Sequence, residues 1–364
     1  MNIAFFGSSL VSAYWNDAAT YYRGIIRALA SLGYSITFFE PDANDRQKYR
    51  DIEDPEWAKV VVYPLTEIGL YWAIKQAAAA DVVIKASRVG VFDDLLEQEI
   101  LYLRRPSTRV IYWDADAPAT LERIYANQED PLRRHITEYD LILTYGGGDQ
   151  VVDAFLSMGA RQCVPVYNAL DTATHFPVKP ERRFEVDLAF IGNRLPDRES
   201  RVDEFFLKPA ASLPSKNFLL GGSGWEDKPL SSNINYLGHV YAPDHNTINC
   251  SATAVLNINR DSMARFGFTP PTRIFEAAGA GACLISNAWE GMEYFLEPDV
   301  EVLVAESGKE VVRILKELTP DKAALIGRAA LDRVLHEHTY DHRALQLDEV
   351  LKSMRSRIRK GAVI

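Results

Sequence analysis

The stretch TPPTRIFEAAGAGACLIS, residues 269–286, holds one arginine and one carboxylate among small and apolar residues. Thr269 is a residue type that caps helices, and the two prolines after it suit a first helical turn, where a missing N–H has no intrahelical partner. A helix start offers backbone N–H groups and a partial positive charge, and Thr272 and Arg273 belong to these opening turns. Glu276 follows on much the same side. The pattern predicts an anion site, with a carboxylate one turn further on that could accept hydrogen bonds from a sugar diol.

The rest of this helix is built from Ala277, Ala278, Gly279, Ala280 and Gly281. Small residues let a helix approach its neighbours closely, although glycine lowers its intrinsic stability. Tight packing must therefore compensate. The competing interpretation is an Ala/Gly-rich core helix with an ordinary surface arginine and glutamate.

A second pair of carboxylates, Asp114 and Asp116, stands in WDADAP at the end of an apolar run. Such a group can orient an acceptor hydroxyl or remove its proton, and both are candidate catalytic residues. A D-x-D pair can also hold a divalent cation through carboxylate oxygens, but we expect no metal here. Asp116 could instead cap the helix that APATLERI predicts.

Strand and helix patterns alternate along the whole chain, which predicts parallel α/β sheets. The alternation runs from NIAFF to YDLILTY, is interrupted by the irregular YNALDTATHFPVKPERRFE, and restarts at VDLAFIGN. We expect two Rossmann-like, doubly wound domains, at 1–170 and 171–338, with 339–364 a helix packing back on the first. Function is expected in the cleft between them, because open α/β sheets bind ligands at their strands' carboxyl ends.

Composition excludes several classes of protein. The 364 residues carry a formal charge of −10, so we expect no nucleic-acid partner. The only basic run, Arg355 to Lys360, is either a solvated helix end or a peripheral contact with a membrane surface. No signal peptide or membrane span is evident, which favours the cytoplasm. GxGxxG is absent, although Glu40 ends a strand where dehydrogenases keep a ribose acid; no cofactor is therefore expected.

The stretch EAAGAGACLIS resembles the signature of the nucleotide-sugar domain of GT-B glycosyltransferases. That resemblance implies a GT-B fold, with the glutamate, here Glu276, on the nucleotide ribose and the helix start facing the pyrophosphate. Further motifs, including YWDADAPATLERI, YNALDTATHFP, DLAFIGNRLPDRESRVDEFF, LLGGSGWEDKP and VLNINRDSMARFGF, together resemble the CgeB-like glycosyltransferases, a group named after a spore maturation protein.

The resemblance also assigns the turns that follow several strands. It implies that IGNRLPDR faces the diphosphate, with Gly192, Asn193 and Arg194 as contacts, and that His239 lies where related enzymes pass the nucleobase. The glycine turn GGSGW adds Gly222 and a possible flat surface, Trp225. The loop after the first strand implies Asp17, with Asn16 beside it, as a contact of the donor or acceptor, and Asp17 is a candidate catalytic residue.

The sequence departs from the GT-B pattern at two positions. Many retaining enzymes have a second glutamate eight residues before the ribose glutamate, and this chain has Phe268 there. Cys283 replaces the usual proline. Asn259, Arg260 and Asp261 are the nearest candidates to take over a donor-sugar contact.

Together these features predict a metal-independent glycosyltransferase that moves a sugar from a nucleotide-diphosphate donor to a glycan, lipid-linked or protein acceptor. Arg260 and Arg273 would stabilise the leaving diphosphate. Two alternatives stay open: a GT-B-shaped binding or surface-assembly protein that has lost catalysis, and a nucleotide-sugar epimerase.

Overall fold

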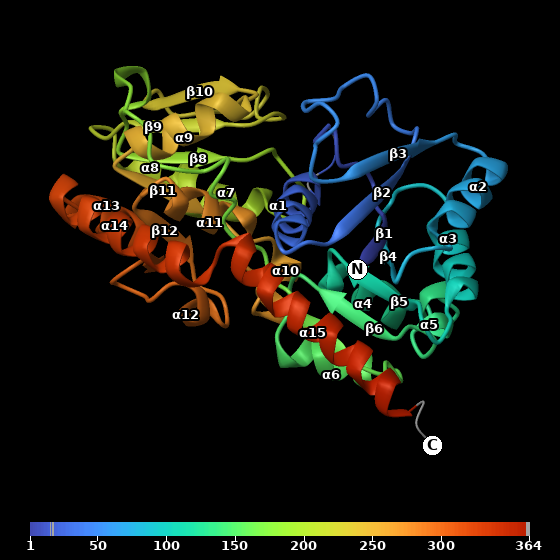
Figure 1. The fold of residues 1–364 in the computed structure, drawn as a ribbon. Helices are drawn as coiled ribbons and strands as arrows, with labels where there is room; N and C mark the ends of the chain where they lie inside the picture. The colour runs from blue at the N-terminus through green and yellow to red at the C-terminus, as the bar shows by residue number, and fades with distance from the viewer. Residues whose placement is uncertain (15, 17, 362–364) are drawn as a thin grey trace. The chain divides into compact units, whose positions relative to one another are not determined.

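The computed structural model describes residues 1–14, 16 and 18–361, with backbone alone at 242–243, 261–262, 264 and 355–361. Its contacts divide the chain into two compact units (Figure 1). The first unit comprises residues 1–168 and the chain from Tyr340 onward, and the second comprises Ala169–Thr339.

The first unit is built on a parallel sheet of order β3-β2-β1-β4-β5-β6-β7. Its strands are β1 (Asn2–Phe6), β2 (Ser35–Pro41), β3 (Lys59–Tyr63), β4 (Val82–Ala86), β5 (Arg109–Asp114), β6 (Leu141–Thr144) and β7 (Cys163–Pro165). Its helices are α1 (Ala18–Ser31), α2 (Glu67–Ala77), α3 (Asp93–Glu99), η1 (Ile100–Leu103), α4 (Ala117–Ala126), α5 (Pro131–His135), α6 (Asp149–Ser157) and α15 (Tyr340–Gly361). The central strands β4 and β6 are buried along their whole length, as a sheet covered on both faces requires.

The terminal helix α15 packs against α1 within this unit. A Cβ atom at Gly24 of α1 would lie 2.1 Å from the Tyr340 ring, so the glycine makes room for that ring. Tyr34 donates a hydrogen bond to Asp348 of α15 at 2.8 Å. The absence of a side chain at Gly24 therefore lets α15 pack closely against α1.

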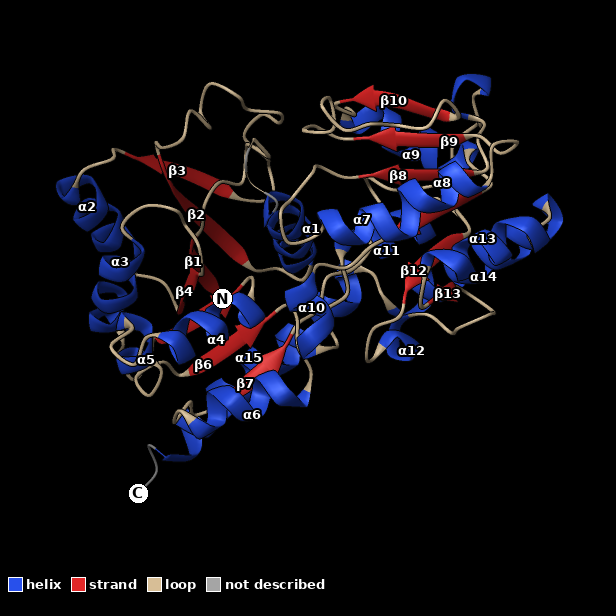
Figure 2. Cartoon of the chain, turned by 180° about the vertical axis from the view of Figure 1, so that it is seen from behind, coloured by secondary structure: helices blue, strands red, loops and turns tan. Residues whose placement is uncertain are grey.

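The second unit repeats the architecture with sheet order β10-β9-β8-β11-β12-β13, again parallel (Figure 2). Its strands are β8 (Leu188–Ile191), β9 (Phe218–Gly221), β10 (Ile234–Gly238), β11 (Ala254–Asn257), β12 (Leu284–Asn287) and β13 (Leu303–Ala305). Its helices are η2 (Arg182–Phe184), α7 (Glu199–Val202), η3 (Asp203–Leu207), α8 (Lys208–Ser212), α9 (Ala242–Ser251), α10 (Asp261–Phe266), α11 (Thr272–Gly279), α12 (Met292–Phe295), α13 (Gly308–Glu317) and α14 (Pro320–Glu337). The predicted pair of doubly wound α/β sheets is confirmed.

Across the described part of the chain, no helix combines the length and the apolar character that crossing a bilayer demands.

Candidate functional site

The helix that carries the opening motif is α11, and it begins later than the sequence suggested. Its first residue is Thr272, and Pro271 stands at the cap position with φ −67° and ψ 146°. Thr269 does not cap it: its hydroxyl donates to the Gly267 carbonyl at 2.8 Å, which corrects that expectation. The first turn holds no acidic residue, so the positive end of the helix dipole is not neutralised from within the helix.

Small residues allow α11 to lie against its neighbours. Its buried face is formed by Ile274, Phe275, Ala277, Ala278 and Gly279. A Cβ atom on Gly279 would approach the Leu170 side chain to 2.3 Å. The Ala/Gly run is thus a packing surface, and it fixes which way the opposite, polar side of α11 faces.

That polar side begins with Arg273, whose guanidinium lies 5.2 Å from the centre of the Phe190 ring. Arg198 contacts the same ring at 5.6 Å. Desolvation and the repulsion of Arg198 lower the pKa of Arg273 to about 10, while Glu276 opposes the shift. Two guanidinium groups held around one ring, at a helix start, form a site suited to a multiply charged anion.

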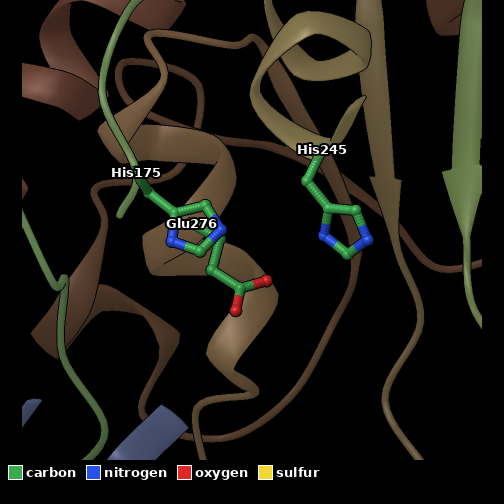
Figure 3. A group of neighbouring side chains, drawn as sticks. All are labelled: His175, His245 and Glu276. Atoms are coloured by element: carbon green, nitrogen blue, oxygen red, sulfur yellow. The ribbon is translucent and has the colours of Figure 1, made fainter. Parts of the chain in front are cut away.

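Glu276 lies one turn further along α11, in a group with His175 and His245 (Figure 3). One ligand-type atom from each side chain lies within 4.8 Å of the others, and all three residues are half-buried. Burial lowers the pKa of His245, and the adjacent carboxylate of Glu276 opposes that shift. The sequence interpretation missed both histidines and Arg198, because no local spacing links them to α11.

The turns after β8 and β9 are interlocked. Gly192 N–H donates to the Gly221 carbonyl at 2.8 Å, and Gly222 N–H to the Gly238 carbonyl at 2.7 Å. Asn193 Oδ1 accepts from the Ser223 N–H at 3.0 Å. Gly222 has φ +116°, and a Cβ there would lie 2.3 Å from the Gly192 oxygen. The bond between Ser223 and Asn193 holds the two turns together, the bond from Gly222 joins the second turn to the end of β10, and the N–H groups of both glycines are already used.

Two residues near these turns differ from the expectation. Trp225 is completely buried in the core, with its indole N–H donating to the Gly192 carbonyl at 2.8 Å. It therefore offers no flat surface to a ligand. Arg194 lies 2.7 Å from both Glu199 and Asp227, so its guanidinium is held by two carboxylates rather than presented to a diphosphate.

The segment after β11 is a buried amide network. Asn259 N–H donates to Asn287 Oδ1 at 2.8 Å, and Asn257 Nδ2 donates to Asn259 Oδ1 at 2.9 Å. Asn259 is fully buried, and its Nδ2 has no hydrogen-bond partner within the part of the protein that the structure describes. Arg260 stands at the cap of α10 and lies 3.8 Å from Asp197. In this structure Asn259 shapes the strand end and is not exposed to a sugar.

His239 lies between β10 and α9, exposed, with its ring edge-on to Tyr241 at a centroid distance of 4.6 Å. It is accessible to a ligand. The side chain of Asp261, the third alternative for a sugar contact, is outside the described residues, as are those of the basic tail 355–360.

In the first unit, Asp114 is fully buried at the end of β5. Its Oδ1 accepts from the Asp116 N–H and the Thr120 hydroxyl, each at 3.0 Å. Burial raises the pKa of Asp114 to about 6, and these hydrogen bonds offset part of the rise. Asp116 makes no side-chain capping hydrogen bond and instead accepts from Arg88 at 2.9 Å. Both carboxyls are turned into the protein in this structure, and neither is open to an acceptor.

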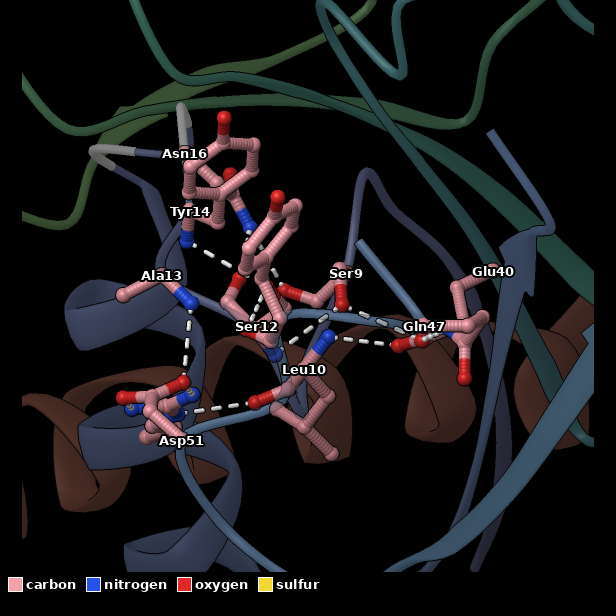
Figure 4. A network of polar contacts seen from close by, with 11 residues as sticks. Ser9, Leu10, Ser12, Ala13, Tyr14, Asn16, Glu40, Gln47 and Asp51 are labelled. Carbon is pink, nitrogen blue, oxygen red and sulfur yellow. Dashed lines mark hydrogen bonds and ion pairs between the residues drawn. The ribbon is translucent and has the colours of Figure 1, made fainter. Parts of the chain in front are cut away.

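The loop after β1 is held by buried polar groups (Figure 4). Glu40 Oε2 accepts from the Leu10 N–H at 2.6 Å, and Asn16 donates to the Ser9 and Ser12 carbonyls at 2.9 Å. Glu40 is fully buried, and desolvation raises its pKa. It therefore shapes a loop rather than binding a ribose, and Asn16 has the same structural role. Asp17, the catalytic candidate beside it, lies outside the described residues.

The comparisons with known proteins relate both units to one fold. Residues 198–349 match a family model described as Glycosyl transferase-like. Sucrose-phosphate synthase from Thermosynechococcus elongatus superposes with a TM-score of 0.69 at 13% identity, covering 98% of this chain and 100% of that one. Anabaena HepE in complex with UDP and glucose gives 0.67 at 13% identity, with 97% and 100% covered. A glycosyltransferase from Rickettsia africae gives 0.61 at 12% identity, with 97% and 98% covered.

The chain has the GT-B fold. The matched segment includes Arg273 and Glu276 of α11 and two of the residues beside them, Arg198 and His245, so most of this site lies inside the glycosyl transferase-like region of this GT-B chain. None of these comparisons names the CgeB-like group. A comparison with curated proteins found no match.

Proposed function

We propose that this GT-B protein is a glycosyltransferase that moves a sugar from a nucleotide-diphosphate donor to an acceptor hydroxyl, in the synthesis of a cell-surface glycan or glycoconjugate. One observation carries the proposal. Arg198 and Arg273 gather around Phe190 at the start of α11, and Glu276 stands one turn beyond them.

The charges match the parts of such a donor. Two guanidinium groups that repel one another in the free protein gain most from a diphosphate, whose charge increases as the sugar bond breaks. Glu276 would accept hydrogen bonds from both ribose hydroxyls. The leaving group would then be stabilised by fixed charges and a helix dipole without an obligatory metal ion.

The donor nucleotide is proposed to be a uridine nucleotide. HepE of Anabaena, which shares the fold, was solved with UDP-glucose bound. We assign the acceptor to the first unit, where Asp17 remains the candidate to contact it. Asp114 and Asp116 are assigned to holding the β5–α4 turn.

A thermal-melt screen against UDP, GDP, dTDP, CDP and ADP, with and without magnesium, tests the donor site. A ligand at 100 times its Kd should stabilise the native state by about 2.7 kcal/mol. We expect UDP to raise the melting temperature without magnesium. Glu276→Gln should weaken UDP binding roughly 10- to 100-fold, because hydrogen bonds to a charged group contribute about 1.5–3 kcal/mol.

Glu317→Gln, which alters an exposed carboxyl on α13, is the matched control and should bind UDP like the wild type. An unchanged Kd for Glu276→Gln would remove the ribose role. A melting temperature that no nucleotide raises would favour the binding-protein alternative.

A further inference from the structure

The side chains of His175, His245 and Glu276 form a group of possible metal ligands that nucleotide binding alone does not explain. Two imidazoles and one carboxylate, each contributing one atom within 4.8 Å of the others, come from three separate segments: the loop before η2, α9 and α11. Figure 3 shows both rings close to the Glu276 carboxylate. Two histidines with a glutamate are a set that zinc accepts, leaving a coordination position open.

Hydrogen bonds around the cluster orient the rings. The Thr174 hydroxyl can donate its proton to the Asp171 carbonyl at 3.2 Å, and in that arrangement it accepts from His175 Nδ1, 3.0 Å away. The proton is then on Nδ1, and the lone pair of Nε2 is available to a metal. A ligating histidine typically has such a partner on its other nitrogen.

His245 is held in a comparable way. A hydrogen bond to the backbone of Val240 engages its ring. Asn246, the next residue of α9, donates to the Thr174 carbonyl at 2.8 Å. This bond ties the loop of His175 to the helix of His245, so both histidines are brought to Glu276 before any ligand arrives.

We propose that His175, His245 and Glu276 bind one zinc ion, and that bound zinc excludes the nucleotide by occupying Glu276. The exclusion rests on the proposed ribose role of Glu276, whereas zinc binding itself does not. Zinc–ligand bonds of roughly 2.0–2.2 Å require the three atoms to move closer together than 4.8 Å. The positive charge of Arg273, one turn away, repels a zinc ion, so this site should bind zinc more weakly than a structural zinc site does. Magnesium, which prefers oxygen ligands, should not bind here.

Isothermal titration of chelator-treated full-length protein with zinc alone tests the site, and cobalt in place of zinc gives a visible spectrum of the ligand set. We expect one zinc per chain. His175→Ala and His245→Ala should each weaken it at least tenfold, since even the hydrogen-bond partners of metal ligands contribute about 10- to 100-fold. His336→Ala, which removes an exposed histidine on α14, is the control and should bind like the wild type. His175 lies in a loop, so its variant remains informative if His245→Ala misfolds.

Equal zinc affinity in the wild type and both histidine variants, or no binding at millimolar zinc, would overturn the proposal. The competition is measured separately, as the change in apparent UDP affinity on adding zinc, in the wild type and in His175→Ala. A zinc-dependent loss of UDP binding only in the wild type supports the exclusion. If zinc binds but does not change the affinity for UDP, the exclusion is refuted. If zinc does not bind but Glu276→Gln still weakens UDP binding, the zinc proposal fails and the glycosyltransferase proposal stands.

Discussion

Replacing Asp114 with asparagine should change how the stability of the protein depends on pH. Burial raises the pKa of this carboxyl from 3.8 to about 6. The folded state therefore holds its proton more tightly than the unfolded state does. The resulting stabilisation is complete below pH 3.8 and is lost as the pH rises through about 6. At pH 8 the wild type carries a buried charge that the variant lacks.

The magnitude follows from the shift. About 2 pKa units correspond to about 3 kcal/mol over the full range. Between pH 8 and pH 5 the wild type should regain roughly 1.4 kcal/mol, because its carboxyl takes up the proton over this interval. The asparagine side chain of the variant would take up none. The stability of Asp114→Asn relative to the wild type should therefore be higher at pH 8 than at pH 5 by that amount.

Urea unfolding at pH 5, 6, 7 and 8 measures this difference. Asp153→Asn, which removes an exposed carboxyl on α6, serves as the control. Its effect should stay within about 0.5 kcal/mol, as for most surface substitutions. A gap between Asp114→Asn and the wild type that is the same at pH 5 and pH 8 would refute the assignment of a buried, destabilising charge to Asp114.

Three further substitutions test other parts of the structure. Arg273→Ala should weaken nucleotide-diphosphate binding roughly 10- to 100-fold without lowering the unfolding free energy, because it removes a charge that Arg198 repels. The control Arg313→Ala, exposed on α13, should change neither quantity. An Arg273→Ala protein that is less stable but binds normally would contradict the prediction. In thermal unfolding, Gly33→Ala should cost about 1–2 kcal/mol, because Gly33 has a positive φ and open space around it, and Gly222→Ala should cost more, because an added Cβ at Gly222 also meets the Gly192 oxygen. Equal losses of stability would count against the interlocked turns. Glu40→Ala should cost at least about 2 kcal/mol in urea unfolding, because it leaves the Leu10 N–H buried without its acceptor, and a smaller cost would mean that the loop rearranges.

The sequence predicted the sheets well, because apolar runs between turn residues depend on local patterning. The strands β4, β5 and β11 have the sequences VVIKA, RVIYWD and AVLN, which are apolar runs of the kind on which the predicted alternation rests. The sequence of the three-residue edge strand β7, CVP, is too short to show a period, so the pattern could not predict this strand.

The opening helix shows where local rules conflict. A threonine before two prolines suggested a cap, but a residue that precedes proline is disfavoured in helical conformation. The helix therefore starts after the second proline, and Thr269 bonds its own turn.

The site residues were only partly predictable. Arg273 and Glu276 share one helix, so their spacing was informative. His175 and His245 reach Glu276 only through the fold, and their sequence context gave no signal. For Trp225 the sequence could not distinguish an aromatic side chain beside a ligand from one that fills the core behind a glycine turn.

The most direct test of the central claim is the release of nucleoside diphosphate from a panel of UDP-, GDP-, dTDP-, CDP- and ADP-sugars by the purified protein. Without an acceptor, a glycosyltransferase of this kind should hydrolyse one donor class slowly, with UDP-sugars expected, and Arg273→Ala should reduce that rate at least tenfold. Wild-type protein that is stabilised by UDP but releases no diphosphate from any donor would contradict the account and leave a GT-B-shaped binding protein.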